Sequence, residues 1–417
     1  MKKHLCALSA VAAAAFLSAC GGGDAPRAAG PAQSAVTLSS VQIGAATAAS
    51  SATPTYVDVA GAHIVSQTQL TARTIALTIS TSSFTANTVV EVTLPTGYAS
   101  DPARRWPVTY FLGGTGHDES SFRALYDGEN LTASYPSLVV SPYAGVGYWS
   151  DWFNVGAGGP PKYETFVSSQ LIALIDANFN TIANRAHRAL IGDSMGGYGA
   201  MMMAARHPDQ FVAASSISGA VDTNFLQGTL VTAASPTIYP ALPDSIYGLR
   251  LSEEVRWRGH NPVDLADNLR DVQLQVRTGN GVFSAANGES LLSVDPIGCA
   301  VEAALIQPES ISLHDTLSTL GIAHVMQQYA WGCHSEIFFQ QEIRDSLPGF
   351  VAAFGTPAPA SFNYRSIEPS FSVYGWSLVA DPARALEFLA LGGVSSEGFT
   401  VSGSGVTVVT TPPLFAP

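Results

Sequence analysis

The chain has 417 residues, of which 47% are hydrophobic and 12% are charged, and its formal net charge is −13 at pH 7. A chain of this length and composition can bury a large core, which excludes a wholly disordered protein. The acidic balance argues against nucleic acids and anionic surfaces as partners, because both repel negative charge.

The first 20 residues have the pattern of a lipoprotein export signal. Lys2 and Lys3 precede an apolar stretch over residues 5–16, which ends in Leu17-Ser18-Ala19-Cys20 and three glycines. The stretch is too short to span a bilayer, and small residues precede Cys20, which is typical of a cleaved signal. We expect residues 1–19 to be removed and Cys20 to be lipidated, although an ordinary signal with an incidental Cys20 is the alternative. The prediction is a lipid-anchored protein of the cell envelope, facing the periplasm or the exterior.

The segment that follows the signal predicts a tether and then a folded body. Residues 20–55 are rich in Gly, Ala, Ser, Thr and Pro and contain little to bury, which is typical of a flexible linker. The folded part should begin near Tyr56, with strands around residues 76–79 and 89–94. Residues 107–112 predict a further buried strand, followed by the glycine-rich turn Gly113-Gly114-Thr115-Gly116.

The most informative motif is Gly192-Asp193-Ser194-Met195-Gly196, between a strand-like run at 189–191 and a helix-like run at 198–205. Gly-x-Ser-x-Gly between a strand and a helix forms a sharp turn that presents the serine as a nucleophile. The main-chain amides of Met195 and, from the preceding glycine turn, Thr115 are candidates for the oxyanion hole. His117 and Asp118 follow that turn and could face a substrate, although loop residues are usually only solvated.

A serine nucleophile needs a base, and in α/β-hydrolases the acid and then the histidine follow the serine in the chain. His334 lies in a loop between a strand-like run at 325–329 and a helix-like run at 336–346, which is where this fold places its base. His260 is a weaker candidate. Structural roles are expected for the remaining histidines after the serine, which are His207, His314 and His324.

The orienting acid should follow the predicted strand at 273–278, which leaves Glu289, Asp295 and Glu302 as candidates. After loss of the signal and lipidation of Cys20, only Cys299 and Cys333 remain. In an exported protein these are expected to form a disulfide, with two buried free thiols as the alternative. The bridge would hold the chain just before Glu302 against His334, which favours Glu302.

Several segments resemble the secreted mycolyltransferases of the antigen 85 complex and their esterase relatives, the esterase D group. The similar segments occur in the same order over residues 105–350. They are Tyr148-Trp149-Ser150-Asp151-Trp152-Phe153, Tyr163-Glu164-Thr165-Phe166, Ala204-Ala205-Arg206-His207-Pro208-Asp209-Gln210-Phe211, Gly279-Asn280-Gly281 and Gly332-Cys333-His334-Ser335.

The resemblance implies an α/β-hydrolase fold, with a mostly parallel central sheet and helices on both faces. It also implies that Ser194 is the nucleophile, His334 the base and Glu302 the acid. Gly113 and Gly116 stand where the mycolyltransferases have an aspartate and an arginine, and Glu336 replaces a tryptophan. Transfer to trehalose is therefore not expected. The small side chains at these positions predict a more open cleft.

The C-terminal part, residues 356–417, falls outside the resemblance. Strand-like segments at 362–364, 371–376, 398–401 and 406–410 and a short helix at 382–391 are expected. We expect these strands and those of residues 56–95 to form one small sheet beside a catalytic domain of residues 56–355. A stabilising appendage is favoured over a surface that binds a polymeric ester.

Together these features predict a serine carboxylic-ester hydrolase whose partner is an ester substrate. Neither a metal ion nor an organic cofactor is implied by the motifs. The alternatives are an acyltransferase that uses a sugar or lipid alcohol, and a binding lipoprotein on an inactive hydrolase scaffold.

Overall fold

The computed structural model describes residues 55–153, 161–238, 241–290, 294 and 296–413. The predicted signal, Cys20 and nearly all of the tether lie outside the described residues. Within these ranges, no helix is both long and apolar enough to cross a membrane.

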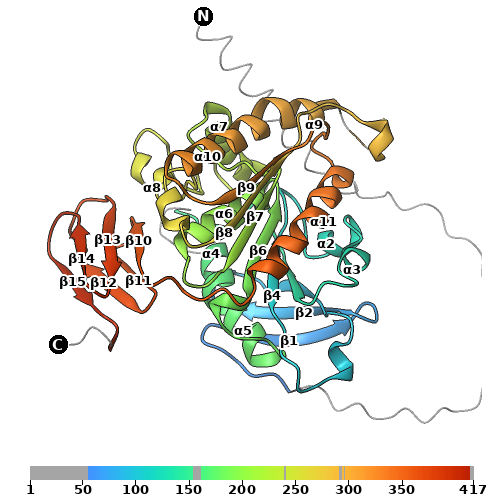
Figure 1. Cartoon of the computed structure of the whole chain (residues 1–417), viewed down its shortest axis with the longest axis horizontal. Coiled ribbons are helices and arrows are strands. Elements are labelled where there is room, and N and C mark those ends of the chain that lie inside the picture. Colours follow the sequence, from blue (N-terminus) through green and yellow to red (C-terminus); the bar gives the residue numbers. More distant parts are fainter. Residues whose placement is uncertain (1–54, 154–160, 239–240, 291–293, 295, 414–417) are drawn as a thin grey trace, which may run out of the picture.

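A nine-stranded sheet forms the centre of the molecule (Figure 1). Its strand order is β1-β2-β3-β5-β4-β6-β7-β8-β9. The strands from β4 to β9 run parallel, whereas β1, β2 and β3 form an antiparallel meander that joins the sheet at β5. The strands are β1 (Ala62–Gln69), β2 (Thr74–Thr81), β3 (Thr88–Thr93), β4 (Val108–Leu112), β5 (Leu138–Pro142), β6 (Arg188–Asp193), β7 (Ala213–Ile217), β8 (Gln273–Thr278) and β9 (His324–Gln328).

Both faces of this sheet are covered by helices, because its central strands are apolar on both sides. Tyr110 and Leu112 of β4 pack into the core on the side of α5, α6 and α10, while Phe111 packs into the core formed with α11. This alternation is expected for a buried parallel sheet. The helices are α2 (Ser121–Ala124), α3 (Gly128–Leu131), α4 (Tyr163–Thr165), α5 (Ile172–Asn178), α6 (Met195–Arg206), α7 (Leu226–Ala234), α8 (Glu254–Arg258), α9 (Pro296–Val301), α10 (Gln307–Thr319) and α11 (Glu336–Ala353).

The C-terminal part forms two small antiparallel sheets with their own apolar core, β10-β13-β14 and β11-β12-β15. Figure 1 shows them beside the main body, at the left of the view, apart from β1 and β2. Tyr364 Oη donates a hydrogen bond of 2.7 Å to the carbonyl of Arg206, so this part contacts the C-terminal end of α6. The strands are β10 (Phe362–Ser366), β11 (Ser370–Val373), β12 (Trp376–Ala380), β13 (Leu389–Ser395), β14 (Gly398–Ser402) and β15 (Thr407–Thr410).

Two predictions about the ends of the chain are wrong. The N-terminal strands do not pair with the C-terminal strands, because β3 bonds to β5 and extends the central sheet. The helix expected over 382–391 is absent from the described chain, and β13 begins at Leu389. Leu389 and Leu391 are both buried, and their two-residue spacing buries one face of a strand.

Candidate active site

Ser194 occupies the turn between β6 and α6, with φ 54° and ψ −119°, a conformation that non-glycine residues rarely adopt. The motif glycines permit this turn by allowing close contact between its arms. A Cβ on Gly196 would lie 1.8 Å from the carbonyl oxygen of Leu112, and one on Gly192 would lie 2.3 Å from the carbonyl oxygen of Gly196. The motif therefore places the serine in a strained and closely packed turn at the carboxyl ends of the parallel strands.

His334 lies in the loop between β9 and α11, as predicted from its neighbours. Its Nε2 is 2.9 Å from Ser194 Oγ, and its Nδ1 is 2.8 Å from Glu302 Oε2. The ring packs edge-on against Phe339, with 4.8 Å between ring centroids. The imidazole is thus held between a hydroxyl and a carboxylate, an arrangement suited to general-base chemistry.

Glu302 begins a π-helical segment, Glu302–Ile306, that joins α9 to α10. Such segments are rare and recur at functional sites. Its buried Oε1 accepts hydrogen bonds from Thr278 Oγ1 at 2.8 Å, the Gly279 amide at 2.8 Å and Ser218 Oγ at 2.9 Å. With His334 at the other oxygen, four hydrogen-bonding groups surround the carboxyl and fix its position.

The other predicted candidates are occupied elsewhere. Glu289 accepts hydrogen bonds from the amides of Ser284 and Cys333, and Asp295 lies outside the described residues. His260 Nδ1 is bonded to the Arg256 carbonyl at 2.8 Å, and burial lowers the pKa of His260 to about 4. The imidazoles of His314 and His324 are bonded to one another at 2.7 Å.

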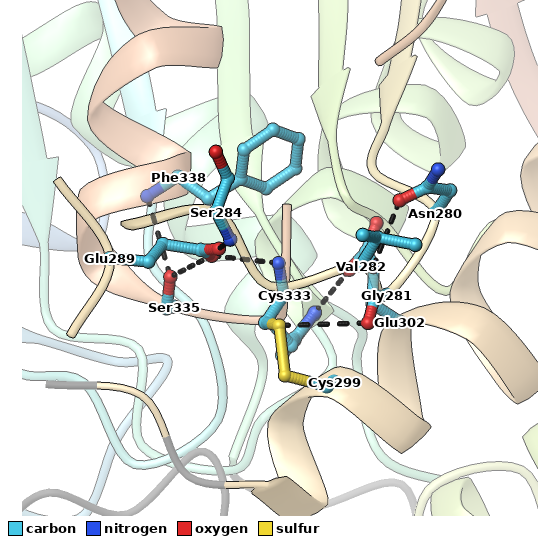
Figure 2. Close-up of a disulfide and its surroundings, with 11 residues drawn as sticks. Asn280, Gly281, Val282, Ser284, Glu289, Cys299, Glu302, Cys333, Ser335 and Phe338 are labelled. Atoms are coloured by element: carbon cyan, nitrogen blue, oxygen red, sulfur yellow. Dashed lines mark hydrogen bonds and ion pairs between the residues drawn. A yellow bond between two sulfur atoms is a disulfide. The ribbon is translucent and has the colours of Figure 1, made fainter. Parts of the chain in front are cut away.

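The histidine loop is held from two sides (Figure 2). A disulfide joins Cys299 of α9 to Cys333, directly before His334. Glu289 Oε1 accepts from the Cys333 amide at 2.8 Å, and its Oε2 accepts from the Ser284 amide at 2.7 Å. Glu289, a candidate acid in the sequence, therefore braces the loop that carries the imidazole.

A small pocket opens at Ser194 and contains the predicted oxyanion residue Thr115 together with His117, Ser335, Glu336 and Phe339. Met195 is the first residue of α6, and within the described chain neither its amide nor that of Thr115 donates a hydrogen bond. Both amides are thus available where an oxyanion hole is expected. Asp118 is not part of the pocket lining, and its carboxylate accepts from Ser120 instead.

Sequence reasoning missed Asp193 as a member of this site. Its carboxyl is fully buried beside the pocket, accepts a 3.0 Å hydrogen bond from Tyr126 Oη and lies 3.4 Å from His117 Nδ1. Burial raises the pKa of Asp193 above its usual range. The available signal was its place next to the nucleophile, since a buried carboxyl there must be protonated or paired.

Two of the segments that carry the family resemblance meet away from Ser194, at the C-terminal end of α6. Glu164 Oε1 accepts from Arg206 Nε at 2.7 Å and lies 2.8 Å from His207 Nε2, while Arg206 also pairs with Glu368. Burial opposes ionisation of Glu164, but Arg206 and His207 outweigh it and hold its pKa well below the usual range. These residues form an ion cluster in which Glu164 and Arg206 are buried and Glu368 is partly exposed.

Metal-ligating side chains are not clustered in the part of the chain that the structure describes: no group of three or more His, Cys, Asp or Glu there is placed to hold an ion. The chemistry that the site offers through its own residues is that of the serine, imidazole and carboxylate.

The central sheet, its helices and the turn at Ser194 define an α/β-hydrolase, which confirms the predicted fold class. Residues 81–350 match the family model Esterase, described as "Putative esterase". The chain belongs to this esterase family, and the resemblance stated from the motifs is confirmed.

Curated relatives agree with this placement. Esterase Rv1288 of Mycobacterium tuberculosis is 30% identical over 278 residues, which is 65% of this chain and 57% of that protein. The mycolyltransferase Ag85B of Mycobacterium leprae, also named a diacylglycerol acyltransferase, is 28% identical over 205 residues, or 44% of this chain and 58% of that protein. The chain thus spans somewhat more than half the length of these relatives.

Solved structures show the same fold. The S-formylglutathione hydrolase of Agrobacterium tumefaciens superposes with a TM-score of 0.54 and 16% identity, covering 70% of this chain and 99% of that one. MPT51 of Mycobacterium tuberculosis superposes with a TM-score of 0.54 and 20% identity, covering 65% of this chain and 95% of that one.

Proposed function

We propose that this protein is a serine carboxylic-ester hydrolase that works through an acyl-enzyme on Ser194. The observation that carries the proposal is the continuous hydrogen-bonded chain from Ser194 through His334 to Glu302. Family membership supports the same class of reaction.

In the proposed mechanism, His334 Nε2 takes the proton of the Ser194 hydroxyl as its oxygen attacks the ester carbonyl. Glu302 keeps the proton of the imidazole on Nδ1 and stabilises the cation. The amides of Thr115 and Met195 donate to the oxyanion. The protonated His334 then gives its proton to the departing alcohol, and a water molecule, deprotonated by the same imidazole, releases the acid and frees Ser194.

Transfer of the acyl group to an alcohol is a second candidate function, favoured by the similarity to Ag85B of Mycobacterium leprae. Hydrolysis is preferred here because the glycine-rich turn at residues 113–116 offers no side chain longer than that of Thr115 to hold a sugar acceptor. The two reactions share every step up to the acyl-enzyme and differ in whether water or an alcohol attacks it.

Turnover of p-nitrophenyl esters, from acetate to long acyl chains, tests both proposals. The soluble form beginning after Cys20 is compared with Ser194→Ala and His334→Ala, with and without glycerol or a sugar. The esterase is supported if both substitutions abolish hydrolysis and the added alcohol does not change its rate. The transferase is supported if the acyl group appears on the added alcohol. More than about a tenth of wild-type turnover in His334→Ala would refute the assigned base. Absence of Ser194-dependent turnover and of labelling by a fluorophosphonate would instead favour a binding protein.

We further propose that the protein is exported and anchored to the cell envelope by lipid on Cys20. The supporting pattern is the lysine pair, apolar run and Leu-Ser-Ala-Cys sequence at the start of the chain. Cys20→Ala should release the protein from the membrane fraction, and mass spectrometry of the mature N-terminus should find a diacylated Cys20. An unmodified N-terminus elsewhere would refute the anchor.

The boundary between a catalytic domain, residues 56–355, and an appendage, residues 356–417, is likewise proposed. The appendage is assigned a stabilising role, supported by its contacts with the end of α6 that is remote from Ser194, such as the Tyr364–Arg206 hydrogen bond. A helix of 12 residues is about 18 Å long, which separates this contact from the nucleophile.

A further inference from the structure

A second buried carboxyl stands behind the proposed catalytic acid. Glu342 of α11 has no solvent exposure, and its Oε2 lies 3.0 Å from Ser218 Oγ. The same Ser218 oxygen lies 2.9 Å from Glu302 Oε1, so one hydroxyl bridges two carboxyl groups. Ser218 follows β7 in a left-handed conformation, with φ 42°, that non-glycine residues seldom adopt without a functional or structural reason.

The hydrogens available to Ser218 and the two carboxyl groups indicate which of these groups carries a proton. A serine hydroxyl has one hydrogen and cannot donate to two carboxylates at once. Glu302 Oε1 already accepts from Thr278 and Gly279, and its other oxygen faces His334, so each of these contacts is with a group that can donate a hydrogen. Glu342, in contrast, has one buried oxygen, Oε1, with no hydrogen-bond partner in the described chain. A buried carboxylate left in this state would be costly.

We propose that Glu342 is a protonated positioning residue for the triad: its Oε2–H donates to Ser218 Oγ, which directs the serine hydrogen to Glu302 Oε1. The inference rests on the proposed function of Ser194, His334 and Glu302. Its consequence is that Glu302 keeps three fixed donors on one oxygen and presents the other to His334 Nδ1. A neutral Glu342 also spares the triad a second negative charge.

The groups that face Glu342 agree with this assignment. Burial, and then the nearby Glu302 carboxylate, raise the pKa of Glu342 well above its usual range, against smaller effects of Ser218, Arg277 and His334. The Nη1 of Arg277 donates to Tyr329 Oη and its Nη2 to Gln275 and the Asp345 carbonyl, and its Nε has no hydrogen-bond partner in the described chain. None of these hydrogen bonds goes to Glu342.

Kinetics of two variants separate this role from packing. Glu342→Gln keeps a neutral donor, so kcat/KM should stay within about threefold of wild type and the acid limb of its pH profile should not move. Glu342→Met keeps the volume without a donor and should lose about tenfold in kcat. In a Ser218→Ala background the Met substitution should cost nothing more, because the bridge is already broken.

Infrared difference spectra supply a readout that does not depend on catalysis. The wild type should show the carbonyl band of a protonated carboxyl at pH 7 that disappears in Glu342→Gln. The matched control is Glu309→Gln: Glu309 is equally buried, and burial raises its pKa too, but it contacts the Asp222 amide rather than the triad. This control should lose a comparable band and leave the pH profile unchanged.

Three results would overturn the inference: no such band for Glu342, an acid limb that moves to lower pH in Glu342→Gln, or an equal cost of Glu342→Met in both backgrounds. A missing band or a shifted acid limb would mean that Glu342 is ionised. An equal cost of Glu342→Met in both backgrounds would mean that Glu342 contributes packing alone. Failure of the proposed function looks different, because Ser194→Ala would then retain turnover. The infrared band would still report the proton on Glu342 in that case.

Discussion

Replacing Glu302 by glutamine tests how the proposed triad holds its proton, because the contacts of Glu302 dictate how the amide must be oriented. Oε1 receives three donors, from Ser218, Thr278 and the Gly279 amide, at 2.8–2.9 Å. An NH2 group placed there would lose all three hydrogen bonds, at about 1 kcal/mol each. The amide oxygen therefore keeps the Oε1 position, and the NH2 group faces His334 Nδ1.

The expected loss follows from the histidine tautomer. With an NH2 donor opposite, Nδ1 must accept, so the imidazole proton moves to Nε2 and that nitrogen can no longer take the proton of Ser194. The equivalent amide substitution in serine proteases lowers kcat about 10⁴-fold, which corresponds to about 5.4 kcal/mol. We expect a loss of this size for Glu302→Gln, although the change is one atom and the packing is preserved.

The assay is hydrolysis of a short p-nitrophenyl ester, with the melting temperature as a check on folding. Glu289→Gln is the matched control, because Glu289 is a buried glutamate that braces the same loop through the amides of Cys333 and Ser284. Its kcat should exceed that of Glu302→Gln by at least about 100-fold. Glu302→Gln retaining more than about a tenth of wild-type kcat, or the two variants losing equally, would refute the assignment of Glu302 as the orienting acid.

Three further predictions concern stability. Cys299→Ser with Cys333→Ser should lower the free energy of unfolding by about 4 kcal/mol, since the bridge closes a loop with a sequence separation of 34; two free thiols in the native protein would contradict this. Glu164→Gln should cost about 3 kcal/mol in urea unfolding, because it leaves a buried cation short of a partner. The folded pKa of Glu164 is lowered, so this cost should be full above the ordinary pKa of about 4.3 and shrink as the pH falls below it; a constant cost would refute the pairing. Gly196→Ala should yield insoluble or inactive protein, because its Cβ would overlap the Leu112 carbonyl; normal solubility and turnover would show that the turn can relax.

The sequence was sufficient for the parts of the site that depend on local pattern. The turn at Ser194 could be predicted because this turn needs glycines at fixed offsets from the serine. A Cβ on Gly192 or Gly196 would lie only 2.3 or 1.8 Å from a main-chain carbonyl oxygen. The loop of His334 could be predicted because strand and helix periodicity flank it. Glu302 was favoured through the Cys299–Cys333 pair, and the structure contains that disulfide.

What the sequence could not supply depends on partners far along the chain. Ser218 and Glu342 are 124 residues apart, and neither belongs to a motif, so the bridge to Glu302 appears only when β7, α11 and the π-helical segment meet. The same limit explains the error about the N-terminal strands. Alternating residues in β1 to β3 predict strands but not their neighbour, and pairing of β3 with β5 is set by the sheet as a whole.

The two ends of α6 explain why the family resemblance is more informative about fold than about substrate. The segments around Glu164 and Arg206 are held together by an ion pair at its C-terminal end, which is remote from Ser194. The pocket at its N-terminal end contains His117 and Glu336 beside Ser194 and His334, so a substrate of the proposed reaction would meet these two side chains. The motif resemblance also implies that Glu336 stands where the mycolyltransferases have a tryptophan. Exchange of these two side chains should therefore change the preference for acyl chain or acceptor, whereas changes at the ion cluster should alter stability and leave that preference intact.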